Sequence, residues 1–154
     1  TEPRCNCRTG TSSTLSWTRC LDRVRRGEGW GSVVQGDRVL SLRIESSRDI
    51  NRLEVFTGDT PLKAATVNGI ALSDYYLENR RNGKLVTHYM SDNDATQLLL
   101  RFSKGSPLEL TIYEASNDLL SNPLFSIPPR PENLLPMPFV LNDAVLQIKT
   151  LHFE

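Results

Sequence analysis

The side chains that could do chemistry are few and widely spaced in this sequence. Its two histidines, His88 and His152, both lie in stretches whose alternation of apolar and polar residues predicts strands. Neither has a carboxylate or a nucleophile at a spacing typical of general-base or zinc catalysis. The sequence also contains no His-Glu-x-x-His, Gly-x-Ser-x-Gly or P-loop motif. We therefore expect no catalytic residue, no metal site and no cofactor in this chain.

Two further groups contain metal-ligand residue types, but neither forms a complete site. Cys5, Cys7 and Cys20 all fall within the first twenty residues. Cys20 could pair with Cys5 or Cys7 in an oxidising compartment, or the three could begin a zinc site, which would need a fourth ligand. Unpaired thiols on a loose segment are the interpretation that we favour. Asp92-Asn93-Asp94 begins like a calcium loop but lacks the later glycine and glutamate, so a turn is expected there.

Three aromatic residues are the candidate ligand-binding positions. Trp30 lies among glycines in Asp22–Gly31, a charged segment that predicts a turn, and Tyr75 and Tyr76 lie in the polar stretch Asp74–Gly83. Together they could form a platform for a carbohydrate or a peptide, because aromatic rings offer a large apolar face with a polar tip. Burial of Trp30 in the core is the alternative, and we favour it because single aromatics usually bury their area.

The elements that must position these side chains are strands. Apolar residues alternate with polar ones, as in Leu40, Leu42 and Ile44, and turn residues separate the alternating runs. Asn68-Gly69 between two runs predicts a two-residue hairpin, because both residues accept the positive φ of a type I′ turn. The sequence therefore predicts an all-β fold, an antiparallel β-sandwich (jelly-roll or immunoglobulin-like) with about eight strands and little helix. The expected strand regions are residues 39–45, 53–56, 66–72, 85–90, 97–102, 108–112 and 144–153.

A proline-rich connection leads into the last expected strand. Six of the nine prolines lie between Pro123 and Pro138, and proline lacks the N–H that helices and interior strands need. These prolines predict a long irregular crossing over the domain surface, after which Ala144–Phe153 returns as a strand. We expect both faces of this strand to be covered over part of its length. One face would carry Val145, Leu151 and Phe153, and the other Leu146 and Ile148.

Length and composition predict a single folded domain. Of the 154 residues, 1–37 are expected to form a partly disordered N-terminal segment with one possible strand around Trp17, and 38–154 to form the sandwich. Lys plus Arg and Asp plus Glu both number 18, a balance that argues against a nucleic-acid partner. No run approaches the eighteen apolar residues of a membrane span, so we expect no membrane insertion by this segment. The polar start, without a signal peptide or initiator Met, predicts a processed chain or a piece of a longer protein.

Several short motifs from residue 38 onward resemble one known family. Leu40–Ile44 followed by Ser46-Ser47-Arg48 is similar to a strand with a Ser-x-Arg ending, and Ala65–Gly69 to a Val-x-Val-Asn-Gly hairpin. Tyr113–Leu119, Arg130-Pro131 and Asn142–Val145 resemble the closing pattern of the same domain. This domain is the C-terminal non-catalytic β-sandwich of multi-spanning zinc aminopeptidases, a metallopeptidase family that includes vacuolar and endoplasmic-reticulum membrane proteases. The Cys-rich start of the chain has no counterpart in the pattern.

The resemblance implies an accessory role and assigns no catalytic residue to this chain. In that family the zinc ligands belong to a separate peptidase domain, transmembrane helices follow it, and the sandwich lies on the non-cytosolic side. The resemblance thus implies an extracytoplasmic module, in the periplasm or an organelle lumen, whose partners are the other domains of the parent protein. A free-standing module that binds carbohydrate or peptide through Trp30, Tyr75 and Tyr76 is the alternative. A third possibility is an assembly domain whose exposed edge strand pairs with a partner.

Overall fold

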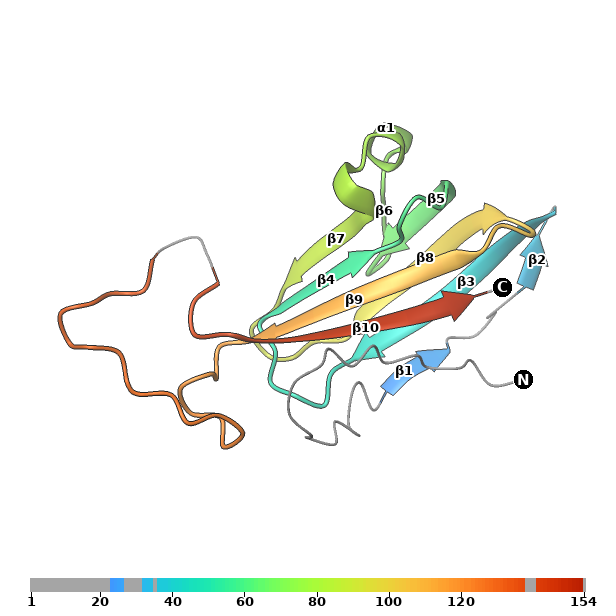
Figure 1. Cartoon of the computed structure of the whole chain (residues 1–154). Coiled ribbons are helices and arrows are strands. Elements are labelled where there is room, and N and C mark those ends of the chain that lie inside the picture. Colours follow the sequence, from blue (N-terminus) through green and yellow to red (C-terminus); the bar gives the residue numbers. More distant parts are fainter. Residues whose placement is uncertain (1–22, 27–31, 35, 138–140, 154) are drawn as a thin grey trace.

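The chain forms two antiparallel sheets packed face to face, which confirms the predicted all-β sandwich (Figure 1). The computed structural model describes residues 23–26, 32–34, 36–137 and 141–153. Ten strands lie in these ranges, a few more than the eight or so predicted. The short helix α1 (Asp74–Glu78) and a 3₁₀ turn (Arg81–Gly83) lie between the sixth and seventh strands. The six-stranded sheet contains β1 (Arg23–Arg26), β2 (Ser32–Val34), β3 (Asp37–Glu45), β5 (Leu62–Val67), β6 (Ile70–Ala71) and β8 (Thr96–Ser103). The four-stranded sheet contains β4 (Arg52–Phe56), β7 (Lys84–Tyr89), β9 (Leu108–Ser116) and β10 (Val145–Phe153).

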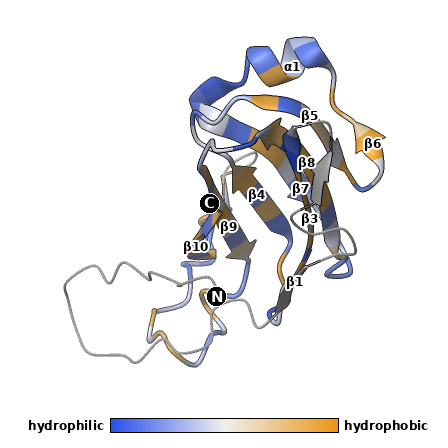
Figure 2. Ribbon diagram, turned by 90° about the vertical axis from the view of Figure 1, so that its right-hand side faces the viewer, coloured by the Kyte–Doolittle hydropathy of each residue, from blue (hydrophilic) through white to orange (hydrophobic). Residues whose placement is uncertain are grey.

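The core lies between the two sheets because alternate residues of the long strands point inward. On β8 every second residue from Thr96 to Phe102 is buried, while Gln97 and Leu99 between them are exposed. Burying a single Leu, Ile or Phe side chain contributes about 1.5–3 kcal/mol, so the facing strands supply most of the driving force. Figure 2 shows the resulting alternation of hydrophobic and hydrophilic residues along the strands. The fully buried side chains of both sheets include Leu98, Leu100, Phe102, Leu53, Val55, Leu110 and Ile112.

The predicted hairpin at Asn68-Gly69 is confirmed. Val67 pairs with Ile70, and the two residues between them have φ angles of 49° and 81°, as a type I′ turn requires. Asn68 also fastens the turn to the neighbouring strand, since its Oδ1 accepts a hydrogen bond from Gln97 N at 2.7 Å. The sequence signal and the tertiary contact therefore favour the same backbone conformation.

The last strand is an integral part of the four-stranded sheet, but it is covered on one face only. β10 pairs with β9 over its whole length, from Val145 opposite Ser116 to Phe153 opposite Leu108. Val145 and Leu151 are buried, whereas Leu146 and Ile148 on the opposite face are 47% and 54% exposed. The prediction of cover on both faces was therefore wrong. An antiparallel sheet commonly packs one face on the core and leaves the other in solvent.

Two loop predictions also need correction. Asp22–Gly31 was expected to be a turn, but Arg23–Arg26 forms β1 and pairs with β3 from Glu45 to Leu42. Backbone hydrogen bonding at a sheet edge does not require alternating apolar side chains, so the charged sequence gave no sign of it. The polar stretch after Ser73 contains α1, whose N-cap is the Ser73 hydroxyl accepting from Tyr76 N at 3.2 Å. The strand expected around Trp17 lies outside the described residues.

The described part of the predicted N-terminal segment 1–37 pairs with the sandwich, because β1 and β2 both lie in this segment and both pair with β3.

Among the described residues, no helix is long and apolar enough to cross a membrane.

Candidate functional site

The most distinctive part of the described surface is the connection between β9 and β10, residues 117–144, which we call the proline loop. It leaves the end of the sandwich and extends beyond the sheets before it returns to β10, rather than lying over the domain surface as predicted (Figure 1). Its described residues form neither helix nor strand. The prolines explain this, because each fixes φ and removes a hydrogen-bond donor.

Local turns nevertheless give the proline loop a defined path. Three i to i+3 hydrogen bonds close successive turns: Ser121 N to Asp118 O at 3.0 Å, Phe125 N to Asn122 O at 3.1 Å, and Leu134 N to Pro131 O at 2.9 Å. The second turn has Pro123 at its first central position, where proline is favoured, and the Asn122 side chain accepts a further bond from Leu124 N at 3.0 Å. The loop is thus shaped by its own turn residues.

The start of the proline loop is fixed to the sandwich by Arg48, which lies between β3 and β4. Arg48 Nη2 donates to Ser116 Oγ and, at 3.4 Å, to the carbonyl oxygen of Val145, so one guanidinium contacts both strands that flank the loop. Ser116 Oγ in turn donates to Asp118 Oδ1 at 2.5 Å, and Arg48 Nη2 lies 3.7 Å from the same carboxylate oxygen. The Arg48 side chain is 18% exposed, which makes these charge-assisted bonds stronger than surface ones.

Asp118 accepts a second bond that holds the first turn of the loop. Asn122 Nδ2 donates to its Oδ2 at 2.8 Å. Burial raises the pKa of Asp118, but the hydrogen bonds from Ser116 and Asn122 and the charge of Arg48 together lower it by more than burial raises it. The pKa of this carboxyl therefore lies below its usual value. Asp118 is therefore ionised near neutral pH and binds its donors as a carboxylate.

The end of the proline loop is fixed by Asp143. Its carbonyl oxygen accepts from Leu119 N at 2.9 Å, which ties the two ends of the loop together. Its carboxylate forms an ion pair with Arg130, so a residue from the middle of the loop is drawn back to the base. Asn142 Nδ2 donates to Met137 O at 2.5 Å nearby. The loop is consequently closed at its base by bonds from both directions.

Apolar side chains are concentrated on the proline loop. Fifteen large hydrophobic residues are exposed in the described part of the chain, and eight of them lie between residues 120 and 141. Leu135 is 88% exposed, the most of all. Leu146 and Ile148, which follow the loop in sequence, are also exposed on the outer face of β10. A concentration of exposed apolar residues in one segment favours a binding surface more than single exposed residues do. The eight are Leu120, Leu124, Phe125, Ile127, Leu134, Leu135, Met137 and Leu141.

A buried carboxyl group lies behind the base of the loop. Glu114 continues the inward-facing row of β9 and is only 2% exposed. Burial raises its pKa above the usual value, and the hydrogen bond from Ser46 and the charges of Arg48 and Lys149 offset this only in part. Glu114 Oε1 and Arg48 Nη1 are both buried without a hydrogen-bond partner among the described residues. The inner end of the core is therefore polar where it meets the loop.

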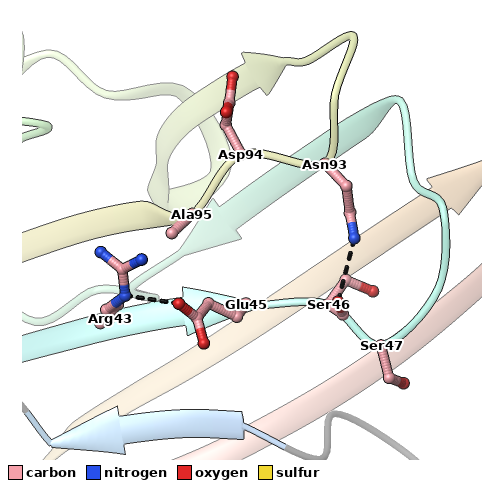
Figure 3. Close-up of a pocket in the computed structure, with 7 residues that line it drawn as sticks. All are labelled: Arg43, Glu45, Ser46, Ser47, Asn93, Asp94 and Ala95. Carbon is pink, nitrogen blue, oxygen red and sulfur yellow. Dashed lines mark hydrogen bonds and ion pairs between the residues drawn. The ribbon is translucent and has the colours of Figure 1, made fainter.

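A shallow polar hollow of about 490 Å³ lies beside the Ser46-Ser47 turn and is lined by residues 43, 45–47 and 93–95 (Figure 3). Its polar groups largely satisfy one another: Arg43 Nε donates to Glu45 Oε1 at 2.6 Å, and Asn93 Nδ2 donates to Ser46 O at 3.1 Å. The described residues contain no group of three or more His, Cys, Asp or Glu side chains placed to hold a metal ion. Asn93, predicted to lie in a turn, has a φ of 56° there.

Of the predicted aromatic platform, the described residues include Tyr75 and Tyr76. Tyr75 and Tyr76 are neighbours on α1, where consecutive side chains point about 100° apart. Tyr75 is 77% exposed, whereas the Tyr76 hydroxyl donates to Leu85 O at 3.1 Å and fastens the helix to β7. Trp30 lies outside the described residues, as do Cys5, Cys7 and Cys20.

The two histidines lie apart from each other and from the proline loop's ion pairs. His88 Nδ1 is 2.7 Å from Thr96 Oγ1, a contact between the two sheets, and Thr96 is fully buried. His152 is exposed on β10, with Nδ1 3.6 Å from Glu109 Oε2. Both act as strand residues with ordinary polar partners.

Sequence reasoning singled out the prolines of the loop but missed the residues that fix it. Arg48 lies in the Ser-x-Arg stretch, and Ser116 and Asp118 lie in Tyr113–Leu119, but neither stretch predicted that these side chains would be bonded to one another, and Arg48 is 68 positions from Ser116. One signal was available: the alternation of β9 continues past Ile112, so Glu114 and Ser116 had to point inward as well. Comparisons with family models, curated proteins and solved structures found no match to this chain.

Proposed function

We propose that this chain is a non-catalytic extracytoplasmic accessory domain of a membrane-bound zinc-dependent aminopeptidase, with a role in assembly, substrate access or partner binding. One observation carries the proposal. Three of the short stretches on which the resemblance rests are far apart in sequence, yet they meet at the base of the proline loop. Ser46–Arg48 reaches Ser116 in Tyr113–Leu119 and Val145 in Asn142–Val145. Arg130 joins the same place through Asp143.

This convergence supports the proposal because the stretches then belong to one hydrogen-bonded cluster at the base of the proline loop. Scattered chance matches have no reason to be hydrogen-bonded to one another. The remaining motif, the Ala65–Gly69 hairpin, lies elsewhere in the fold and supports the β-sandwich only.

The reading frame that encodes Thr1 provides the direct test. We expect the parent sequence to encode transmembrane segments and a zinc-peptidase domain upstream of this chain. A stop codon immediately upstream, or an unrelated domain, would refute the proposal.

A second test uses the purified chain. In the proposed function the zinc and the catalytic residues belong to the peptidase domain, so this chain by itself should bind no stoichiometric zinc and hydrolyse no leucine or alanine anilide. Metal analysis and an aminopeptidase screen measure both. Stoichiometric zinc together with turnover that disappears in His88→Ala would instead assign an enzyme, because His88 is the half-buried imidazole of the two.

The free-standing binding module remains the second candidate, and the exposure of Tyr75 is the observation that favours it. In this alternative Trp30, Tyr75 and Tyr76 contact a carbohydrate or a peptide. Binding of an oligosaccharide panel that is lost in Tyr75→Ala would support this candidate over the first.

A further inference from the structure

The base of the proline loop contains a buried donor and a buried acceptor that are both unused. Arg48 Nη2 donates to Ser116 Oγ and Val145 O, whereas Arg48 Nη1 is buried without a partner among the described residues. Glu114 Oε1 is buried in the same condition, two residues before Ser116 on the inward face of β9. Buried polar groups are nearly always paired in folded proteins. An unused donor near an unused acceptor therefore indicates that these side chains have a second arrangement available.

Ser46 links the two groups. Its hydroxyl accepts from the Arg48 backbone N–H at 3.2 Å and is also hydrogen-bonded to the Glu114 carboxyl. The charge of Arg48 acts on Glu114 as well. Because Arg48 lies in the connection between β3 and β4, its long side chain can turn from the loop toward Glu114 without moving a strand.

We propose that Glu114 and Arg48 form a proton-controlled latch for the proline loop. While Glu114 carries a proton, its carboxyl is neutral, and Arg48 stays on Ser116, Val145 and Asp118 at the base of the loop. When the proton leaves, the buried carboxylate attracts the Arg48 guanidinium. The hydrogen bond to Val145 O, already long at 3.4 Å, is then lost. The loop is consequently held more firmly in acidic than in neutral surroundings. This inference uses only contacts within the chain, so it does not depend on the proposed function.

Burial explains why the ionised Glu114 would compete for Arg48. An ionised carboxyl in the core needs a cation and hydrogen-bond donors, because it has lost its hydration. Arg48 offers an unused Nη1 donor, and arginine binds carboxylates with two parallel hydrogen bonds. Its present carboxylate partner, Asp118, lies 3.7 Å away with a side chain that is 41% exposed, whereas Glu114 is 2% exposed. Charges attract each other more strongly where water is excluded, so the buried carboxylate is the stronger partner.

The other charged groups around Glu114 define the alternatives. Lys149 on β10 also lowers the pKa of Glu114, but less than Arg48 does. On β4 the residue opposite Glu114 is the apolar Leu53, and His88 of β7 lies beyond it in the same row. Asp118 stays ionised over the relevant range, because its pKa already lies below the usual value. Burial raises the pKa of Glu114, so we expect its change of charge above the ordinary Glu value of about 4.3.

Amide hydrogen exchange followed by NMR tests the latch. The Leu119 N–H donates to Asp143 O across the base of the loop and reports its opening. The Thr57 N–H donates to Gly83 O beyond the opposite end of β4 and serves as an internal reference. The ratio of the two protection factors removes the intrinsic pH dependence of exchange. In the wild type we expect this ratio to fall on the order of tenfold as pH rises above about 4.3, since a hydrogen bond to a charged group is lost.

Two variants separate Glu114 from other carboxyls. Glu114→Gln is neutral at every pH, so its ratio should stay constant and close to the wild-type value at low pH. Glu109→Gln removes an exposed carboxylate from the same strand and is the matched control, which should respond to pH as the wild type does.

A second measurement on the wild type needs no variant. The carbon-13 shift of the Glu114 carboxyl and the nitrogen-15 shift of Arg48 Nε should change with one midpoint, which the Leu119 ratio should share. Titration of Glu114 without a change at Leu119 would overturn the latch, because Lys149 would then be the cation that moves. A Leu119 transition that persists in Glu114→Gln, or disappears in His88→Gln, would overturn it too. So would a carboxyl that shows no ionisation before the chain unfolds.

Discussion

Gly83 offers the sharpest test of the packing described above. It lies just before β7 with a φ of +66°, a left-handed conformation that is unfavourable for residues with a Cβ. A Cβ atom at this position would lie 2.6 Å from the carbonyl oxygen of Gly58 and 2.8 Å from its Cα. Both are backbone atoms, so no side-chain rotation can relieve the contact. The Gly83 carbonyl also accepts from the buried residue Thr57 at 2.9 Å, which limits any backbone shift.

The expected cost of Gly83→Ala has two parts. The positive φ contributes about 1–2 kcal/mol. The collision with Gly58 forces a backbone displacement comparable to overpacking a core, at about 1–3 kcal/mol. We therefore expect the free energy of unfolding to fall by roughly 2–5 kcal/mol. For a chain of this length each kcal/mol corresponds to about 2–4 °C, so the melting temperature should fall by roughly 4–20 °C.

Gly69→Ala is the matched control. Gly69 has a φ of +81°, but a Cβ there would meet nothing within 4 Å. Only the conformational cost of about 1–2 kcal/mol applies to it. Urea unfolding followed by circular dichroism measures both variants, and an unchanged m-value would confirm that the native and unfolded states are otherwise alike. Equal losses in the two variants would refute the argument, because the collision would then carry no weight.

Three further predictions concern other parts of the fold. The pKa of Glu114 is raised in the folded state, so its contribution to stability is present below the ordinary Glu pKa of about 4.3 and is lost as pH rises through the folded pKa. The wild type should therefore lose stability relative to Glu114→Gln as pH rises above about 4.3, and urea titrations that show a constant difference would contradict this. A chain that ends at Asp143 lacks β10, which pairs with all of β9, and should unfold without a cooperative transition; a sharp melt near the wild-type temperature would show that β10 is dispensable. Tyr76→Phe removes the hydrogen bond to Leu85 O and should cost about 1 kcal/mol in chemical denaturation, whereas Tyr75→Phe should be neutral, and equal effects would argue against the contact.

The strands could be predicted from sequence wherever burial on one face imposes a period of two. Leu40, Leu42 and Ile44 on β3 show this, and the same pattern identified β8 and β10. β1 could not be found in this way. Its Arg-Val-Arg-Arg sequence has no apolar alternation, and its pairing depends on the free edge of β3, which is a non-local contact.

The candidate site was harder to predict, for a related physical reason. Proline density marked the loop as irregular, and this much followed from local chemistry. Its fixed base depends on Arg48 reaching Ser116 and Val145, residues brought together only when the two sheets have formed. Hydrogen bonds between distant polar residues leave no periodic signal in a sequence. The exposure of both Leu146 and Ile148 was likewise undetermined, because an apolar residue on a strand is equally compatible with a covered and an open sheet face.

The pairing of Ser116 with Val145 has a consequence for protein engineering. The two ends of the proline loop are joined across neighbouring strands, and Leu119 and Asp143 join them a second time. The stability of the sandwich should therefore depend little on the number of residues between Leu119 and Asp143. Doubling that number should cost only about 0.6 kcal/mol in loop-closure entropy. Foreign peptides, such as an epitope or a designed recognition sequence, could replace the interior of the loop while β9 and β10 keep their register. The domain would then serve as a display scaffold whose cargo is exchanged without redesigning its core, and unchanged melting of such chimaeras would be the sign that it does.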